Sequence, residues 1–142
     1  MTAIYSAVIF FVILDRFLKG LAIRAFEINI VGQILKFNLV KNFYIAFSLP
    51  LFGFWLNAVI FLIIFLLLYF FIRSWRDKEQ LAGVCLFAII LGASSNLLDR
   101  LKYGYVIDYF DLKYFTVFNL ADAMIVIGVL LLLVASYKKE AK

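Results

Sequence analysis

The sequence predicts an α-helical membrane protein with four transmembrane helices and a small β-sheet on the membrane surface. Of its 142 residues, 67% are hydrophobic and only 16% are charged, and the mean hydropathy is +1.07. A soluble domain is roughly 45 to 50% apolar and about 25% charged. A chain of 16.4 kDa cannot bury so many apolar residues in its own core, so part of its surface must face lipid. Soluble, disordered and disulfide-scaffold proteins are therefore excluded, and a single domain over residues 1–142 is expected.

Four apolar stretches are long enough to cross a bilayer, which takes about 20 residues in a helix. The second and third contain no charged residue, and the fourth contains only Asp122. The first is apolar as far as Leu14 and then carries three charges. No positively charged leader or cleavage pattern accompanies it, so we interpret it as a permanent span. The predicted spans are 3–23, 51–72, 81–98 and 118–137.

The orientation in the membrane follows from the basic residues. Four spans place both termini and the loop 73–80 on the same side of the bilayer. That loop and the C-terminal tail hold six of the 14 basic residues, a higher density than in the longer connections on the other side. Because basic residues concentrate in short cytoplasmic segments, both termini are expected in the cytoplasm.

The connections on the outer side have the pattern of β-strands. From 26 to 30, and again from 35 to 39, apolar residues alternate with polar ones around a Val-Gly-Gln break. A period of two around a turn predicts a hairpin, and 105–110 is another run of strand-forming residues. We expect a small sheet that presents an apolar face to lipid or to a lipid-bearing ligand.

The amino acids that are missing limit the chemistry. The chain contains no histidine, and Cys85 is its only cysteine. Ser-His-Asp triads, Cys-His dyads, His-ligated zinc and multi-cysteine metal sites are therefore excluded. Any catalysis has to use carboxylates, lysine or hydroxyl groups, and we expect no metal and no organic cofactor.

Asp122 is the ionisable residue that most needs an explanation. It lies one turn into the fourth predicted span, and a charge inside a membrane is costly, about 2.5 to 3.5 kcal/mol at the centre of a helix. Asn119 precedes it on the same helical face. A second carboxylate nearby would give a pair that shares a proton near neutral pH and can activate water. A capping role at the start of the helix is an equally open interpretation.

Polar residues recur on one face of the third span. Gly92, Asn96 and Arg100 follow one another at intervals of four, and Asp99 lies beside Asn96. This face predicts a ligand-binding stripe, although a structural network at the end of the span would look the same. Asp15 and Lys19, four residues apart in the first span, form the favourable order for a salt bridge and are interpreted as a structural pair.

Asp108 is the candidate for the second carboxylate. It lies in the strand-like run, and only ten residues separate it from Asn119, so the chain can bring it back above Asp122. Asp111 is the alternative, closer in sequence but without a matching polar setting. Asn42, just before the second span, can donate and accept hydrogen bonds to a peptide backbone, although taken singly it is more typical of a turn.

These motifs resemble one known family. The blocks NLLDRLKYGYVIDYF (96–110) and FNLADAMIVIG (118–128), preceded by Asn42 and by the Asp15 to Lys19 pair, resemble lipoprotein signal peptidase, also called signal peptidase II. The resemblance implies a four-helix aspartyl endopeptidase of the bacterial inner membrane with an outer β-cradle. Such an enzyme removes the signal peptide of a prolipoprotein just before the diacylglyceryl-modified cysteine.

Carried over by position, the resemblance assigns roles to these residues. The catalytic pair falls on Asp108 and Asp122. The expected partners are lipid-modified prolipoproteins, membrane lipid and globomycin-type inhibitors, with no nucleic acid. Substrate-binding roles fall on Asn42, Asn96, Arg100 and Asn119, and supporting roles on Asp15, Lys19, Asp99, Ala121 and Gly92.

Three other functions remain open from the sequence. Tyr44 and Ile45 stand where the family usually has Gly-Ala, which is expected to narrow the substrate groove and leaves open a protein that binds lipidated peptides without cleaving them. A proton-linked transport component would need polar residues through the whole membrane depth. A Ser-Lys peptidase would use Ser94 or Ser95 with Lys19.

Overall fold

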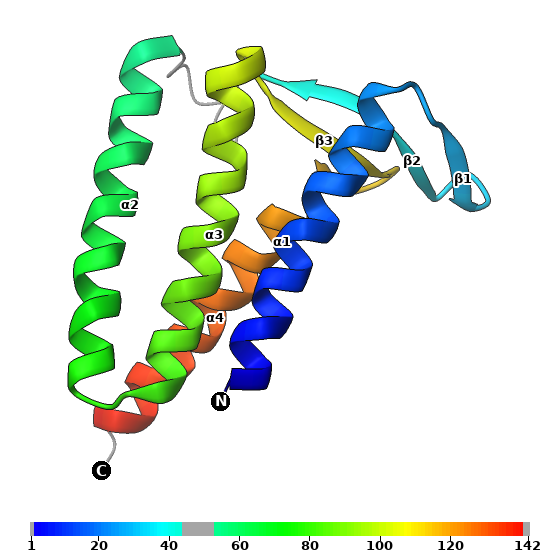
Figure 1. The fold of residues 1–142 in the computed structure, drawn as a ribbon. Helices are drawn as coiled ribbons and strands as arrows, with labels where there is room; N and C mark the ends of the chain where they lie inside the picture. The colour runs from blue at the N-terminus through cyan, green and yellow to red at the C-terminus, as the bar shows by residue number, and fades with distance from the viewer. Residues whose placement is uncertain (1, 44–52, 141–142) are drawn as a thin grey trace.

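The computed structural model describes residues 2–43 and 53–140 and contains four long helices. Tyr44 and Ile45, which depart from the family pattern, lie outside the described residues. The four helices run roughly along one direction, with the chain termini at the same end and a sheet at the other (Figure 1). Their bounds are α1 Thr2–Ile23, α2 Gly53–Arg76, α3 Gln80–Tyr103 and α4 Leu120–Glu140.

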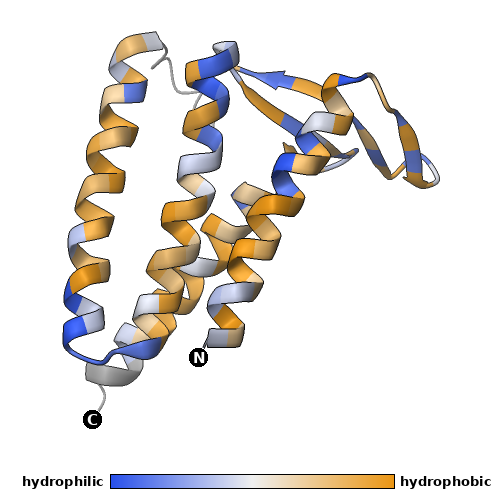
Figure 2. Ribbon diagram, in the orientation of Figure 1, coloured by the Kyte–Doolittle hydropathy of each residue, from blue (hydrophilic) through white to orange (hydrophobic). Residues whose placement is uncertain are grey.

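Three of these helices are long and apolar enough to cross a membrane: α2, α3 and the Leu120–Tyr137 part of α4. Half of the apolar window of α3 is buried, against 6% of that of α2, so α3 is the central helix and packs against the other three. Hydrophobic residues occupy the middle of the helices and hydrophilic ones gather towards their ends (Figure 2). The fourth predicted span, in α1, remains a prediction.

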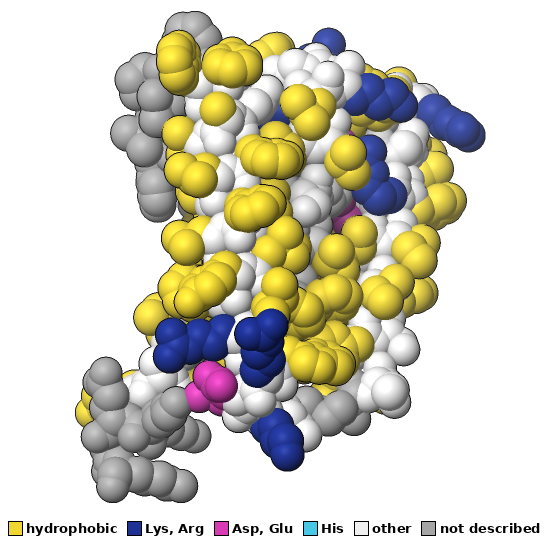
Figure 3. Space-filling model, turned by 60° about the vertical axis from the view of Figure 1, so that its left-hand side comes forward, with side chains coloured by type: hydrophobic (Ala, Val, Ile, Leu, Met, Phe, Trp, Pro, Cys, Tyr) yellow, Lys and Arg dark blue, Asp and Glu magenta, His cyan; other side chains and the backbone are white. Residues whose placement is uncertain are grey.

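The outer surface of the helices is apolar, as contact with lipid requires. On the face that carries α2, hydrophobic side chains cover the middle, and lysines and arginines gather at the lower end and at the upper right (Figure 3). Phe61, Leu62 and Phe65 of α2 are each more than 60% exposed. Large apolar side chains in this number are not left in water by a soluble domain, so this surface faces lipid.

Several helix ends differ from the predicted bounds: α2 ends at Arg76 rather than at 72 and α4 at Glu140 rather than at 137, and two further differences lie near the sheet. Helix α3 continues past residue 98 to Tyr103 and ends where Gly104, at φ 81°, donates its N–H to the carbonyl of Arg100. Helix α4 begins at Leu120 because the two residues before Asn119 form a strand. The predicted span ended where the charged residues begin. The backbone hydrogen bonds of the helix continue past these charges, and the helix ends only at a glycine in the left-handed conformation.

The sheet is antiparallel and four-stranded, with order β1-β2-β3-β4. The predicted hairpin is confirmed by β1 and β2, which turn at Gly32 with a φ of 51°. The predicted third strand is also confirmed, but its pairing with β2 and the short β4 were not predicted. The strands are β1 Ile28–Val31, β2 Leu35–Asn42, β3 Val106–Leu112 and β4 Val117–Phe118.

The sheet is anchored to the end of α1 by a small core. Ala22 of α1 is fully buried together with Ile107 and Tyr109 of β3, and Phe37 of β2 is nearly so. The rings of Phe37 and Tyr109 lie 5.3 Å apart. This core fixes β3 against α1, and β3 carries Asp108.

Candidate functional site

The site begins where α3 and α4 approach each other closely. A Cβ atom at Gly92 would lie 2.7 Å from the carbonyl oxygen of Ala121 and 3.0 Å from the side chain of Ile125. Ala121 is itself fully buried. Glycine and alanine therefore allow the start of α4 to lie directly against α3, which brings Asp122 to the polar face of that helix.

The first turn of α4 is capped by its own residues. The side-chain Oδ1 of Asn119 accepts a hydrogen bond from the backbone N–H of Asp122 at 2.8 Å. In return, Oδ2 of Asp122 accepts one from the N–H of Asn119 at 3.2 Å. This reciprocal pattern is a capping box, so the predicted capping role of Asp122 is confirmed. The other side-chain oxygen of Asp122, Oδ1, takes no part in the cap.

The two candidate aspartates are joined through Asn119. The Nδ2 of Asn119 donates to Oδ1 of Asp108 at 2.6 Å, and Asn42 donates to the other oxygen of Asp108 at 2.9 Å. The free oxygen of Asp122, Oδ1, accepts from Nδ2 of Asn96 at 2.7 Å. One amide side chain thus contacts residues from β3 and α4, and each carboxyl group has a second amide donor of its own.

The charge state of Asp108 is shifted by these surroundings. Burial, and then the negative charge of Asp122, raise the pKa of Asp108 to about 6. The hydrogen bonds from Asn42 and Asn119 act in the opposite direction but are outweighed. Two neighbouring carboxyl groups that cannot both ionise easily hold one proton between them, which is the arrangement required for acid and base catalysis at one site.

Arg100 supplies positive charge to the same region. The guanidinium interacts electrostatically with Asp122, Asp108 and Asp99, in that order of strength. Its side chain is half-buried at the end of α3. The predicted polar face of α3 is therefore brought together with both aspartates.

Lys19 connects the first helix to this site. Its side chain is fully buried, and Nζ lies 3.2 Å from Asp15 and 2.7 Å from Asp99. It also donates to Oδ1 of Asn96 at 2.8 Å, the residue that holds Asp122. The predicted Asp15 and Lys19 pair therefore exists, and it reaches Asp122 through a single side chain.

Three further side chains belong to this network, and the sequence predicted none of them as members; it named Ser95 only as a possible nucleophile. Arg16 pairs with Asp99, and the hydroxyl of Ser95 donates to Asp15 at 2.7 Å. The hydroxyl of Tyr109 also donates to Asp15, at 3.0 Å. Arg16 could have been found, because it is a charge inside an apolar stretch. Tyr109 could not, because a tyrosine in a strand is expected in a core whatever its hydroxyl contacts.

Asp111, the alternative to Asp108, lies elsewhere on the sheet. It pairs in register with Lys36 of β2 and lines a hollow of about 280 Å³ together with Gln33, Lys36 and Lys113. Asp108 is therefore the strand aspartate that meets Asn119. Among residues 2–43 and 53–140, no group of three acidic or cysteine side chains is arranged to hold a metal ion.

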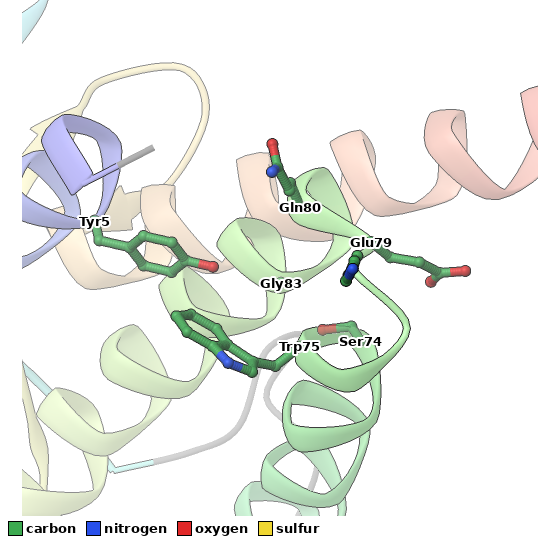
Figure 4. A pocket seen from close by; sticks show the side chains of 7 residues that line it. Tyr5, Ser74, Trp75, Glu79, Gln80 and Gly83 are labelled. Carbon is green, nitrogen blue, oxygen red and sulfur yellow. The ribbon is translucent and has the colours of Figure 1, made fainter.

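A second hollow, of about 350 Å³, lies at the other end of the helices. Tyr5 of α1 and Trp75 of α2 line it, and Gly83 of α3 forms part of its wall (Figure 4). A Cβ atom at Gly83 would lie 3.0 Å from the hydroxyl of Tyr5. This hollow is at the turn between α2 and α3, away from the aspartates.

The fold is similar to that of solved bacterial membrane enzymes. One such structure, solved in meso at 2.3 Å resolution, superposes with a TM-score of 0.82 at 21% identity, covering 99% of this chain and 90% of the other. A second, at 1.9 Å, gives a TM-score of 0.75 at 23% identity and covers 95% and 92%. At these identities the likeness concerns the fold.

Sequence comparison identifies the family. A family profile described as signal peptidase (SPase) II matches residues 7–138. The chain is 32% identical to the lipoprotein signal peptidase of Halothermothrix orenii, covering 96% of this chain and 97% of that protein. It is 39% identical to the one from Caldicellulosiruptor bescii, covering 84% and 81%. The chain therefore belongs to the lipoprotein signal peptidase, or signal peptidase II, family.

Proposed function

We propose that this protein is an aspartyl endopeptidase of the bacterial inner membrane that cleaves prolipoproteins just before the diacylglyceryl-modified cysteine. Asp108 and Asp122 are the catalytic residues. The observation that carries the proposal is that Asn119 donates hydrogen bonds to both carboxyl groups, which come from different elements: its side-chain Nδ2 donates to Asp108 and its backbone N–H donates to Asp122. The substrate class rests on the family, whose members are named lipoprotein signal peptidases.

The chemistry needs one proton on the pair. The ionised carboxyl group takes a proton from water as the water oxygen attacks the scissile carbonyl carbon, and the protonated group gives its proton to the carbonyl oxygen. The tetrahedral diol then collapses as the C–N bond breaks: the amine takes a proton from the carboxyl group that had accepted one from water, and a diol hydroxyl returns its proton to the other carboxylate, which leaves a carboxylic acid product and one proton on the pair. Each aspartate therefore acts once as the base and once as the acid during one turnover, and the pair titrates as a unit.

Neighbouring polar groups are assigned to substrate binding. Asn42 and Asn96 each hold one carboxyl group and have further hydrogen-bonding capacity for a peptide backbone. Arg100 supplies a positive charge beside them. The acyl chains of the substrate lie in the bilayer against the helices, which orients the scissile bond at the depth of Asp122. Globomycin-type inhibitors are expected to compete for this site.

We propose that α1 is the fourth transmembrane span and that both termini lie in the cytoplasm. The three charges of α1 lie near its outer end, and Asp15 and Lys19 are fully buried and paired inside the protein. Their charges therefore do not have to be transferred into lipid. The basic loop between α2 and α3 supports the orientation.

The other functions are less well supported. Most of the buried polar side chains, from Asp15 to Asn119, gather in the cluster around Lys19 and Asn119, whereas a transport pathway needs them through the whole depth. For a Ser-Lys dyad, Ser95 lies 3.4 Å from Lys19. That serine is buried and donates to Asp15, and the lysine is held by two carboxylates.

The proposal is tested by a gel-shift cleavage assay with a diacylglyceryl-modified prolipoprotein in detergent. The parent should cleave it, and Asp108→Asn and Asp122→Asn should lose cleavage while keeping their fold by circular dichroism. Asp111→Asn, on the same strand, is the matched control and should retain activity. Full activity in Asp122→Asn would contradict the aspartyl mechanism, and binding without cleavage by the parent would identify a non-catalytic member of the family.

A further inference from the structure

Tyr109 follows Asp108 in β3, and its side chain is fully buried between the sheet and α1. Its ring packs against Phe37 and Phe110, with ring centroids 5.3 and 4.8 Å away. Ring packing explains an aromatic residue at this position. It does not explain a hydroxyl group, because placing a polar group in a core costs free energy unless the group is hydrogen-bonded.

The hydroxyl group joins three elements. It donates to Oδ1 of Asp15 in α1 at 3.0 Å and accepts from the N–H of Leu120, the first residue of α4, at 2.9 Å. The same Asp15 oxygen accepts from the next amide of α4, that of Ala121, at 3.2 Å. Together with the Asn119 cap of Asp122, these bonds satisfy the first three amides of α4 in succession.

This arrangement links the positions of the two aspartates. Asp108 and Tyr109 are neighbours on one strand, so their backbone positions move together. The Tyr109 hydroxyl fixes Leu120, and Leu120 lies two residues before Asp122. Burial and the adjacent Asp15 raise the pKa of Tyr109 above its ordinary value. The phenol therefore keeps its proton, and remains a hydrogen-bond donor, at neutral and at acidic pH.

We propose that the hydroxyl group of Tyr109 is a positioning group, which holds the start of α4 so that Asp122 lies at a fixed distance from Asp108. This inference rests on the proposed function of the two aspartates. Tyr109 is not a catalytic residue, because its hydroxyl bonds are to Asp15 and Leu120. Removal of the hydroxyl leaves the amide of Leu120 without its partner and allows the helix start to shift, and a misplacement of about 1 Å is enough to reduce turnover about 100-fold.

The test uses Tyr109→Phe, which removes one oxygen atom and keeps the ring. We expect kcat to fall about 10-fold or more with KM changed less than about twofold, because the substrate contacts remain. A wider separation of the carboxyl groups weakens the repulsion that raises the pKa of Asp108. The pair then loses its one proton more easily, so the basic limb of the pH profile should move to lower pH. Tyr5→Phe, a half-buried tyrosine at the other end of the bundle, is the control and should change neither.

A second variant removes the other partner of the bond. Leu120→Pro deletes the donor N–H, and proline is well tolerated at the first position of a helix. If both changes break the same bond, the double variant should lose activity no further than the worse single variant, whereas independent effects would multiply. If Tyr109→Phe folds poorly, Leu120→Pro alone tests the positioning role. It then has to show the same loss of kcat and the same shift of the pH profile.

The inference is overturned if a folded Tyr109→Phe has the kcat and pH profile of the parent, or if its activity falls only as the folded fraction falls. It is also overturned if the two changes multiply. These outcomes are distinct from failure of the proposed function, which would appear as cleavage by Asp122→Asn. Inactive Asp122→Asn together with unaltered Tyr109→Phe would reject the positioning role alone.

Discussion

At the scale of single residues, Asn119 has the most contacts with consequences for the site. Its side-chain oxygen caps α4, and its side-chain nitrogen donates to Asp108 and to Oδ1 of Asn96, at 2.6 and 3.2 Å. The sequence marked this residue as the neighbour of Asp122 on a helical face, and the family resemblance assigned it to substrate binding. Its bond to Asp108 depends on the return of the chain from β3, which residue spacing allows but does not specify.

The two functions of Asn119 can be separated by substitution. Asn119→Asp keeps an oxygen that can cap α4 but removes the amide donors, so it should unfold within a few degrees of the parent and lose cleavage about 100-fold or more. Asn119→Ala should lose cleavage too and also about 1 kcal/mol of helix capping. Thermal unfolding and the gel-shift assay measure both quantities. An active Asn119→Asp would show that the amide does not orient Asp108.

The raised pKa of Asp108 makes a prediction for stability. With a pKa of about 6 in the folded protein and about 3.9 when unfolded, the folded state binds the extra proton between these values. The contribution of Asp108 to the free energy of unfolding is therefore full below about pH 4 and is lost as pH rises through 6. Relative to Asp108→Asn, the parent should lose up to roughly 3 kcal/mol from pH 4 to 7.

Thermal unfolding in detergent at a series of pH values measures this difference. Asp111→Asn is the control on the same strand and should run parallel to the parent over the whole range. A parent and an Asp108→Asn variant whose difference does not change with pH would mean that Asp108 ionises as easily in the folded chain as in the unfolded one.

Among the secondary-structure elements, the sequence predicted which helices and strands form, but not which strands pair. Apolar length predicted the α2 and α3 helices, and a period of two predicted the hairpin and β3. The pairing of β2 with β3 was not predictable, because more than 60 residues and two helices separate Asn42 from its partner Val106. That pairing brings Asn42 within hydrogen-bonding distance of Asp108.

The contact between α3 and α4 is tested at Gly92. Gly92→Ala places a methyl group against the backbone of Ala121, so we expect a loss of about 1 to 3 kcal/mol of stability and reduced cleavage as α4 is pushed away. Gly20→Ala in α1 is the matched control, because a Cβ atom there meets no atom within 4 Å; it should be neutral or slightly stabilising. Equal melting temperatures for the two variants would argue against a close contact.

At the scale of the whole molecule, composition alone was enough to predict a helical membrane protein. The network of charges was predicted in part, because Asp15, Lys19 and Asp99 stand out in apolar surroundings. Tyr109 and Ser95 carry no such signal, since their hydroxyl groups acquire partners only when α1, α3 and β3 are packed together. The single-domain organisation over residues 1–142 and the crossing of the membrane by α1 remain predictions.

The orientation of the molecule is tested by labelling single cysteines in intact cells. Cys85 is buried and is first replaced by alanine. We expect a membrane-impermeant maleimide to label Lys113→Cys, beside the sheet, from outside the cell, and to label Lys78→Cys, between α2 and α3, only after the membrane is opened. External labelling of Lys78→Cys would reverse the proposed orientation.

The full occupation of the α4 amides also limits how the reaction can be driven. Many hydrolases stabilise the oxyanion that forms on the scissile carbonyl with free backbone N–H groups, and a helix start is a common source of them. Here the amides of Leu120, Ala121 and Asp122 are already bonded within the protein. These three amides are therefore not available to the substrate, and under the proposed aspartyl mechanism the oxygen is protonated by a carboxylic acid instead.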